Sequence, residues 1–233
     1  MSSTTRDLPK ACIYCGSREN LTDDHVPPKG VFPKPRPSDL ITVPACEKCN
    51  KDISKDEEYF RLKLCLSEQV GNNPDARKNR EVILRSLKRP EATGFKQSFL
   101  SEIRSMRLRT PAGIHLGRRL AFEVDLHRIF RVVEKSVRGL FFHETGYRLH
   151  PSYEVDIHSN ETLQEYSAEL LEELKQTILI PLAQLSPKII GNGAFAYRFH
   201  ITEEDPFFSV WSLTFYEQVS FLCLTGPMRE KAS

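Results

Sequence analysis

Residues 11–50, ACIYCGSRENLTDDHVPPKGVFPKPRPSDLITVPACEKCN, determine what the N-terminal part of the chain can fold into. The stretch contains two C-x-x-C pairs, Cys12 with Cys15 and Cys46 with Cys49, which are 30 residues apart. It is also rich in glycine and proline, so it cannot bury enough apolar surface to hold itself together. A metal ion bound by four thiolates is the usual staple for such a segment.

The four cysteines predict a structural zinc site. Four sulfur ligands fill the tetrahedral coordination of zinc and leave no open position for catalysis. An iron–sulfur cluster is the main alternative, but the spacing matches none of the common cluster patterns. Cys65 and Cys223 stand alone, and we expect both to be buried apolar side chains.

The N-terminus has no apolar core of a secretory signal, and no apolar run reaches the length of a membrane-spanning helix. We therefore expect a cytoplasmic protein with no membrane contact. Thiols stay reduced in that compartment, which disfavours a disulfide framework.

Charge is distributed unevenly along the chain, although the net charge is only +2. Lys+Arg minus Asp+Glu gives 10 − 4 = +6 for residues 71–110 and 5 − 12 = −7 for residues 149–233. The basic middle could meet a polyanion such as nucleic acid. A solvated helix face rich in arginine and lysine explains the same charge equally well.

Hydrophobic periodicity predicts an α+β protein in three segments: a zinc-stapled module at 1–70, a basic helical segment at 71–110 and an α+β domain of unknown role at 111–233. We expect a frayed tail over residues 1–10. The expected helices span 51–70, 74–89, 94–108, 124–142 and 161–179, the last of them stopped by Pro181. The expected strands, in the C-terminal segment, span 153–157, 194–202, 208–216 and 218–226. We expect Trp211 and Phe215 to belong to its core rather than to stack on bases.

Three polar residues accompany the cysteine pairs. Asp24 and His25 lie nine and ten residues after Cys15, and Asn50 directly follows Cys49. A metal that holds the two pairs together should bring these residues close to one another. His25 could be a general base, a hydrogen-bonded structural histidine or a substitute zinc ligand, and the surrounding motif favours the general base. Asn50 could also cap the helix that follows.

The combination C12-x2-C15, D24-H25, C46-x2-C49-N50 with a helix to follow resembles the HNH (ββα-metal, treble-clef) endonuclease superfamily. It is similar in particular to the zinc-stapled branch that includes phage endonuclease VII. The resemblance covers residues 12 to about 65. It implies that His25 takes a proton from the attacking water, and that Asp24 and Asn50 hold a catalytic Mg²⁺ or Mn²⁺. The implied reaction is hydrolysis of phosphodiester bonds, with DNA preferred as the substrate.

The motif departs from the family where Ile41 stands for a middle asparagine and Asp39 and Thr42 lie nearby. The segment between His25 and Cys46 is long and proline-rich, and it predicts either a substrate-contacting loop or an irregular hairpin. The side chains expected to contact nucleic acid are Lys29, Lys34, Arg36, Lys51, Arg77, Lys78 and Arg80.

Two other functions remain open on the sequence. One is a zinc module without catalytic activity that binds nucleic acid or protein. The other is a nuclease effector of bacterial defence against phage, regulated by its C-terminal part. That part could also form a homodimer or bind a partner protein.

Overall fold

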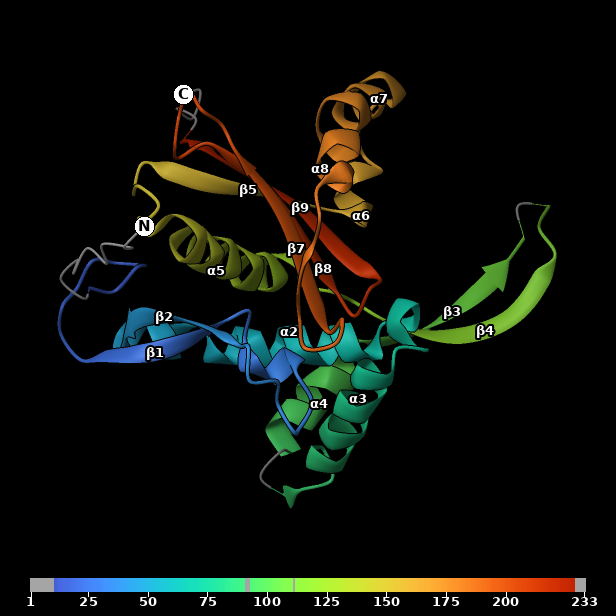
Figure 1. Cartoon of the computed structure of the whole chain (residues 1–233). Coiled ribbons are helices and arrows are strands. Elements are labelled where there is room, and N and C mark those ends of the chain that lie inside the picture. Colours follow the sequence, from blue (N-terminus) through green and yellow to red (C-terminus); the bar gives the residue numbers. More distant parts are fainter. Residues whose placement is uncertain (1–10, 91–92, 111, 229–233) are drawn as a thin grey trace, which may run out of the picture.

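The computed structural model describes residues 11–90, 93–110 and 112–228; the predicted tail at 1–10 lies outside these ranges. A long central helix, α5 (Leu126–Thr145), lies between two layers (Figure 1). On one side are the N-terminal hairpin and helix α2, and on the other side is a five-stranded antiparallel sheet. A second hairpin extends away from this body. The α+β class is confirmed.

The N-terminal module consists of a hairpin followed by helices. Strands β1 (Leu21–Val26) and β2 (Ile41–Cys46) pair in antiparallel register, with His25 opposite Thr42. Between them lie a short 3₁₀ turn at Lys29–Val31 and irregular loop. Helix α1 (Glu47–Asp52) then begins directly at the second cysteine pair. Ile53 separates it from α2 (Ser54–Leu66). The helix expected over 51–70 therefore starts earlier, is interrupted at Ile53 and ends at Leu66, before a 3₁₀ turn at Glu68–Val70.

The basic middle contains one strand that we expected to be helical. Helix α3 (Pro74–Ser86) forms as predicted, with the side chain of Asn73 accepting hydrogen bonds from its first turn. Helix α4 (Thr93–Ser101) ends early, and β3 (Ile103–Arg109) pairs with β4 (His115–Phe122). Apolar residues in 94–108 fit a helical spacing, but pairing with a segment further along the chain decides the conformation here.

The C-terminal segment provides the large sheet, whose strand order is β5-β9-β8-β7-β6. Its strands are β5 (Tyr153–Ser159), β6 (Lys188–Ile190), β7 (Phe195–Ile201), β8 (Ser209–Phe215) and β9 (Val219–Pro227). The four predicted strands are confirmed, and β6 was not predicted. Helix α5 is capped by Asp125 and ends at Gly146, whose φ of 74° suits glycine.

The single helix expected over 161–179 is wrong, because that stretch is divided. It contains α6 (Asn160–Leu163), α7 (Ala168–Leu174) and a π-helical turn at Lys175–Leu179, which continues directly into α8 (Ile180–Gln184). Ser159 and Ser167 each start a new helix by accepting a hydrogen bond from its third backbone N–H. Pro181 does not stop the helix; it lies in the first turn of α8, where proline is tolerated.

One continuous hydrophobic core runs through the molecule, from Ile13 near the N-terminus to Cys223 in β9. Cys65, Cys223, Trp211 and Phe215 are all fully buried, as predicted. Residues from all three sequence segments share this core.

A buried polar contact also joins the three segments. The Tyr216 hydroxyl, in the turn between β8 and β9, donates to the carbonyl of Val31 at 2.6 Å. The amide of Asn79 in α3 donates to both of these oxygens, at 3.0 and 2.7 Å. The sheet is thereby attached directly to the loop that follows His25. Within the residues that the structure describes, no helix is both long and apolar enough to cross a membrane.

Candidate metal centre and catalytic site

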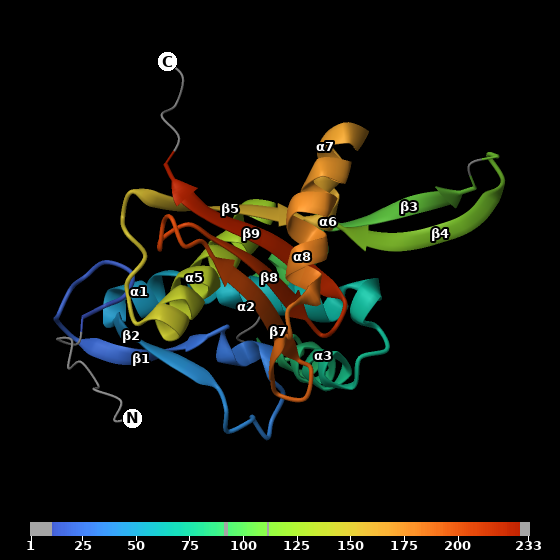
Figure 2. The same ribbon diagram turned by 45° about the horizontal axis from the view of Figure 1, so that its top comes forward.

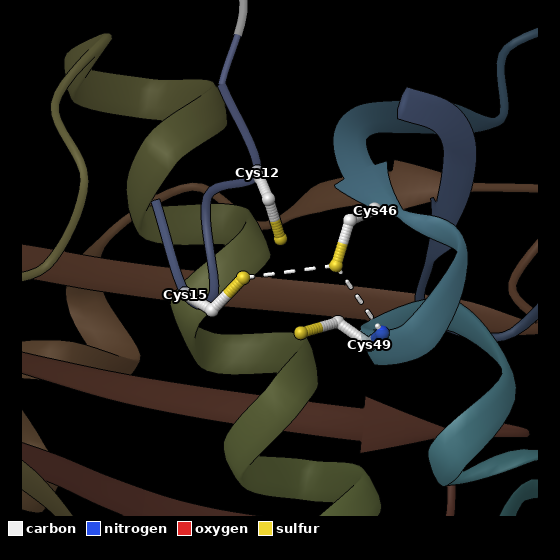
Figure 3. Close-up of side chains that lie close together, drawn as sticks. All are labelled: Cys12, Cys15, Cys46 and Cys49. Carbon is white, nitrogen blue, oxygen red and sulfur yellow. Dashed lines mark hydrogen bonds between the residues drawn. The ribbon is translucent and has the colours of Figure 1, made fainter. Parts of the chain in front are cut away.

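The four cysteines of the two C-x-x-C pairs form one cluster (Figure 3). Their sulfur atoms all lie within 4.8 Å of one another, and the Sγ atoms of Cys15 and Cys46 are 3.6 Å apart. Zinc–sulfur bonds of about 2.3 Å in a tetrahedron put sulfurs about 3.8 Å apart. The cluster therefore has the composition and the spacing to hold one zinc ion.

Local backbone structure aims the sulfurs at a common point. The first pair lies in a tight turn, in which the Gly16 N–H donates to the Cys12 carbonyl at 2.8 Å. Gly16 has a φ of 82°, a conformation that glycine adopts without strain. Cys46 is the N-cap of α1, and its sulfur accepts from the Cys49 N–H at 3.5 Å. The second pair thus comes from the start of a helix.

The chemistry of the clustered thiols also favours a cation. Burial and the neighbouring sulfurs raise the pKa of Cys49. Burial acts to raise the pKa of Cys12, but hydrogen bonds from the backbone N–H groups of Cys46, Cys15 and Tyr14 outweigh it and lower the pKa to about 7. Four sulfurs this close cannot all ionise unless a positive charge lies among them, and a metal ion supplies that charge.

His25 lies on β1, opposite Thr42 of β2, and its imidazole makes no hydrogen bond to the part of the chain that the structure describes. Its side chain is only partly exposed. Burial lowers the pKa of His25, Lys29 and Arg36 lower it further, and Asp24 and Asp23 oppose them. The neutral imidazole, which can accept a proton, is therefore favoured.

Lys29 and Arg36, both exposed, belong to the loop that follows His25, and the Nε of Arg36 donates to the Lys29 carbonyl at 3.2 Å. The loop thus brings two of the predicted phosphate-binding cations to the histidine.

Asp24 points away from solvent, and only 4% of its surface is exposed. Its Oδ2 accepts a hydrogen bond from the Tyr14 hydroxyl at 2.9 Å and forms an ion pair with Lys135 of α5, also at 2.9 Å. The same Lys135 ammonium lies 2.9 Å from the carboxylate of Glu57 in α2. An ammonium group thus neutralises the carboxylate for which a metal-binding role was predicted.

Sequence reasoning missed all three groups around Asp24. Tyr14 lies inside the first cysteine pair, and burial together with the Asp24 charge raises its pKa, so it remains a hydroxyl donor. Burial also raises the pKa of Glu57, although Lys135 opposes the shift. Lys135 is 111 positions after Asp24, and nothing in the local pattern of α5 connects the two residues.

Asn50 lies in α1 beside β1. Its Nδ2 donates to the Thr22 hydroxyl at 3.1 Å and to the Asp23 carbonyl at 3.4 Å. The N-cap of this helix is Cys46, so the capping role considered for Asn50 is not seen. The Oδ1 atoms of Asn50 and Asp24 accept no hydrogen bond from the described residues. Asn50 thus contacts β1 at Thr22 and Asp23, the two positions before Asp24.

The other predicted nucleic-acid contacts are spread over several elements. Lys34 is exposed in the loop after His25, and Lys51 is exposed on α1 and pairs with Glu47. On α3, Arg77 and Lys78 face solvent. The Nε of Arg80 instead donates to the Cys65 carbonyl at 2.7 Å, and this hydrogen bond holds α3 against α2. Ile41, at the position of the family's asparagine, is buried opposite Val26.

Comparison of the chain with known protein families, with curated proteins and with solved structures found no match.

Proposed function

We propose that this protein is an HNH-type endonuclease whose N-terminal module carries the catalytic site. The observation that supports it best is the position of His25. The imidazole lies on a strand fixed beside the four-cysteine cluster, makes no hydrogen bond within the described chain, and has Lys29 and Arg36 close by. A neutral base beside two cations suits the attack of water on a phosphodiester.

Each side chain then has a defined task. His25 accepts a proton from the attacking water. Lys29 and Arg36 attract the phosphate and hold it near the imidazole. The four cysteines bind a structural zinc ion and fix the hairpin to α1, which keeps His25 in place.

Mg²⁺ or Mn²⁺ belongs to the proposal as the catalytic cofactor, with Asp24 and Asn50 as its ligands. The Oδ1 atoms of both residues have no hydrogen-bond partner in the described chain, and these are the oxygen donors that such ions prefer. The ion, when bound, would stabilise negative charge on the phosphate. Lys135 competes for Asp24, so binding of the ion would require the lysine to release this carboxylate.

A cleavage assay tests the proposal. Purified protein would be incubated with a panel of duplex, branched and single-stranded DNA and RNA, with and without added Mg²⁺ or Mn²⁺. We expect metal-dependent cleavage of DNA that leaves 5′-phosphate and 3′-hydroxyl ends, and we expect His25→Ala to lose it while keeping one zinc per chain. If no substrate in the panel is cut with either metal, the protein is not a nuclease of this type.

A zinc module that binds nucleic acid without cutting it is the second candidate. The specific observation in its favour is the buried ion pair between Asp24 and Lys135. In this pair the carboxylate proposed to bind Mg²⁺ instead joins β1 to α5. In that case wild type and His25→Ala would bind the same nucleic acid equally well, and neither would cleave it.

A further inference from the structure

The β3–β4 hairpin, residues 103–122 and here named the arm, extends away from the body in both views (Figures 1 and 2). Along it, apolar side chains remain exposed: Met106 is 54%, Ile114 64% and Leu120 76% accessible. A two-stranded hairpin alone is only marginally stable in water. An arm that packs against so little of its own protein is suited to contact something else.

The root of the arm is held firmly. Lys63 of α2 is only 4% exposed, and its ammonium donates to the Glu123 carbonyl at 2.8 Å and to the Glu102 carboxylate. These two glutamates flank the arm, and the Glu123 N–H donates to the Glu102 carbonyl at 3.1 Å. The Lys63 ammonium also lies 4.4 Å from the ring centre of Phe122. The arm therefore leaves the body in a fixed direction.

The arm carries positive charge only. Within residues 103–122 there is no aspartate or glutamate, and the arginines are Arg104, Arg107, Arg109, Arg118 and Arg119. Arg107 and Arg118 are exposed and lie directly opposite each other in the register. Like charges in directly opposite positions weaken a hairpin. The stability of the arm therefore does not explain this pair, whereas a polyanionic ligand does.

We propose that the arm binds duplex DNA by inserting into the major groove. A seven-residue strand spans about 23 Å, and two paired strands are about 5 Å apart. The major groove of B-DNA is about 12 Å wide and admits a two-stranded ribbon. Arg107, Arg118 and Leu120 lie on one face of the ribbon, because they alternate with the Met106 and Arg119 positions along the paired strands. The two arginines would contact phosphates or guanine edges, and exposed Leu120 would contact apolar groups such as thymine methyls.

The shape of the arm favours DNA over duplex RNA, because the major groove of A-form RNA is deep and too narrow to enter. The charge favours DNA over another arm of the same protein, since two arms with five arginines each repel one another. A second copy of the chain offers its acidic C-terminal segment as another binding partner for the arm. A change of oligomeric state in sedimentation would reveal that contact.

This role rests in part on the proposed nuclease function, because the arm would bind the duplex substrate of that enzyme. Binding and cleavage can be measured separately. Arm-dependent binding without cleavage by the wild type would overturn the nuclease and leave the arm's role standing. Cleavage with no effect of the arm on DNA binding would do the reverse.

The test measures DNA binding in the His25→Ala background without added divalent cation, so that no cleavage intervenes. A fluorescent 30-base-pair duplex serves as the probe, and anisotropy is recorded over a range of salt concentrations. The double change Arg107→Gln and Arg118→Gln should weaken binding by roughly tenfold or more. It should also reduce the slope of log K against log salt by about 1.8, since each lost phosphate contact contributes about 0.9.

The matched control is Lys55→Gln with Lys175→Gln, which removes two exposed positive charges from α2 and the C-terminal helices. It should leave the affinity and the salt slope nearly unchanged. Equal weakening by both double variants would overturn the proposal, as would an equal loss on duplex RNA of the same sequence. A change of oligomeric state in sedimentation on altering the arm would identify it as a contact between copies of the chain instead.

Discussion

The cysteine-bearing end of the N-terminal hairpin and the C-terminal sheet differ in how much apolar surface they bury. The sheet and the elements around it bury large aromatic side chains, among them Trp211, Phe195 and Phe215, all with no exposed surface. Around the cysteines the buried cluster is small and consists of Cys12, Ala45 and Cys46. The loop between β1 and β2 has little regular structure apart from one 3₁₀ turn. Hydrophobic burial supports the sheet, whereas the turns that carry the cysteine pairs bury little apolar surface and bring together four thiols with the spacing to hold a zinc ion.

This difference has a consequence for function. The catalytic role proposed for His25 requires a side chain that is held in a defined position. Strand β1 leads away from the four-cysteine cluster and contacts α5, and both would restrict its movement. Much of the loop after His25 stays open to solvent, where a large substrate can reach it. The sheet contributes indirectly, through the contact of Tyr216 with Val31.

Loss of the metal should have the largest effect. We expect Cys46→Ser to abolish zinc binding and to unfold the two cysteine turns with the adjoining start of β1, because structural zinc contributes about 10 kcal/mol or more in small zinc modules. Val31 and Val43 should stay in the hydrophobic core. Metal content measured by mass spectrometry and hydrogen exchange of β1 would show it. Cys65→Ala is the control, since this buried thiol lies outside the cluster and the variant should keep one zinc per chain. Unchanged exchange in zinc-free Cys46→Ser would contradict the metal's role.

Trp211→Ala tests the stability of the C-terminal sheet. Removing this fully buried ring should cost about 3–5 kcal/mol of unfolding free energy. Chemical denaturation would give that loss, and the folded fraction should still bind zinc. Should the variant lose zinc while it remains folded, the two regions do not have separate sources of stability.

Lys135→Met tests the ion pairs beneath β1. The change leaves the carboxylates of Asp24 and Glu57 without their shared ammonium, and we expect a loss of about 3 kcal/mol. If Asp24 can bind Mg²⁺, millimolar Mg²⁺ should restore part of that loss, since a cation again neutralises the pair. Thermal unfolding with and without Mg²⁺ measures this. Equal melting temperatures would remove Asp24 as a metal ligand.

Tyr216→Phe should have the smallest effect of the four. It removes one hydroxyl and leaves the Val31 carbonyl with the Asn79 amide as its remaining partner, so we expect a loss of about 1–2 kcal/mol. Tyr147→Phe is the control, because that ring is 56% exposed and should tolerate the change. A loss no larger than that of the control would show that this contact does not join the sheet to the loop.

Much of the fold could be predicted because local patterns were strong. The cysteine spacing indicated the cluster, and Pro74 and Gly71 marked the limits of the helices around them. The arm could not be predicted, because Met106 and its neighbours fit a helix as well as a strand, and pairing with β4 decided between the two. The position of Lys135 beside Asp24 could not be predicted either, since the tertiary packing of α5 brings together residues that are far apart in sequence.

The proposed function depends most directly on His25. The decisive measurement is the rate of cleavage of one labelled DNA duplex, with Mg²⁺, by wild type and His25→Gln prepared to the same zinc content. A general base contributes about 10²–10⁴-fold to the rate, so the variant should be slower by at least about 100-fold. Equal rates for the two proteins would contradict the assignment of His25 as the catalytic base.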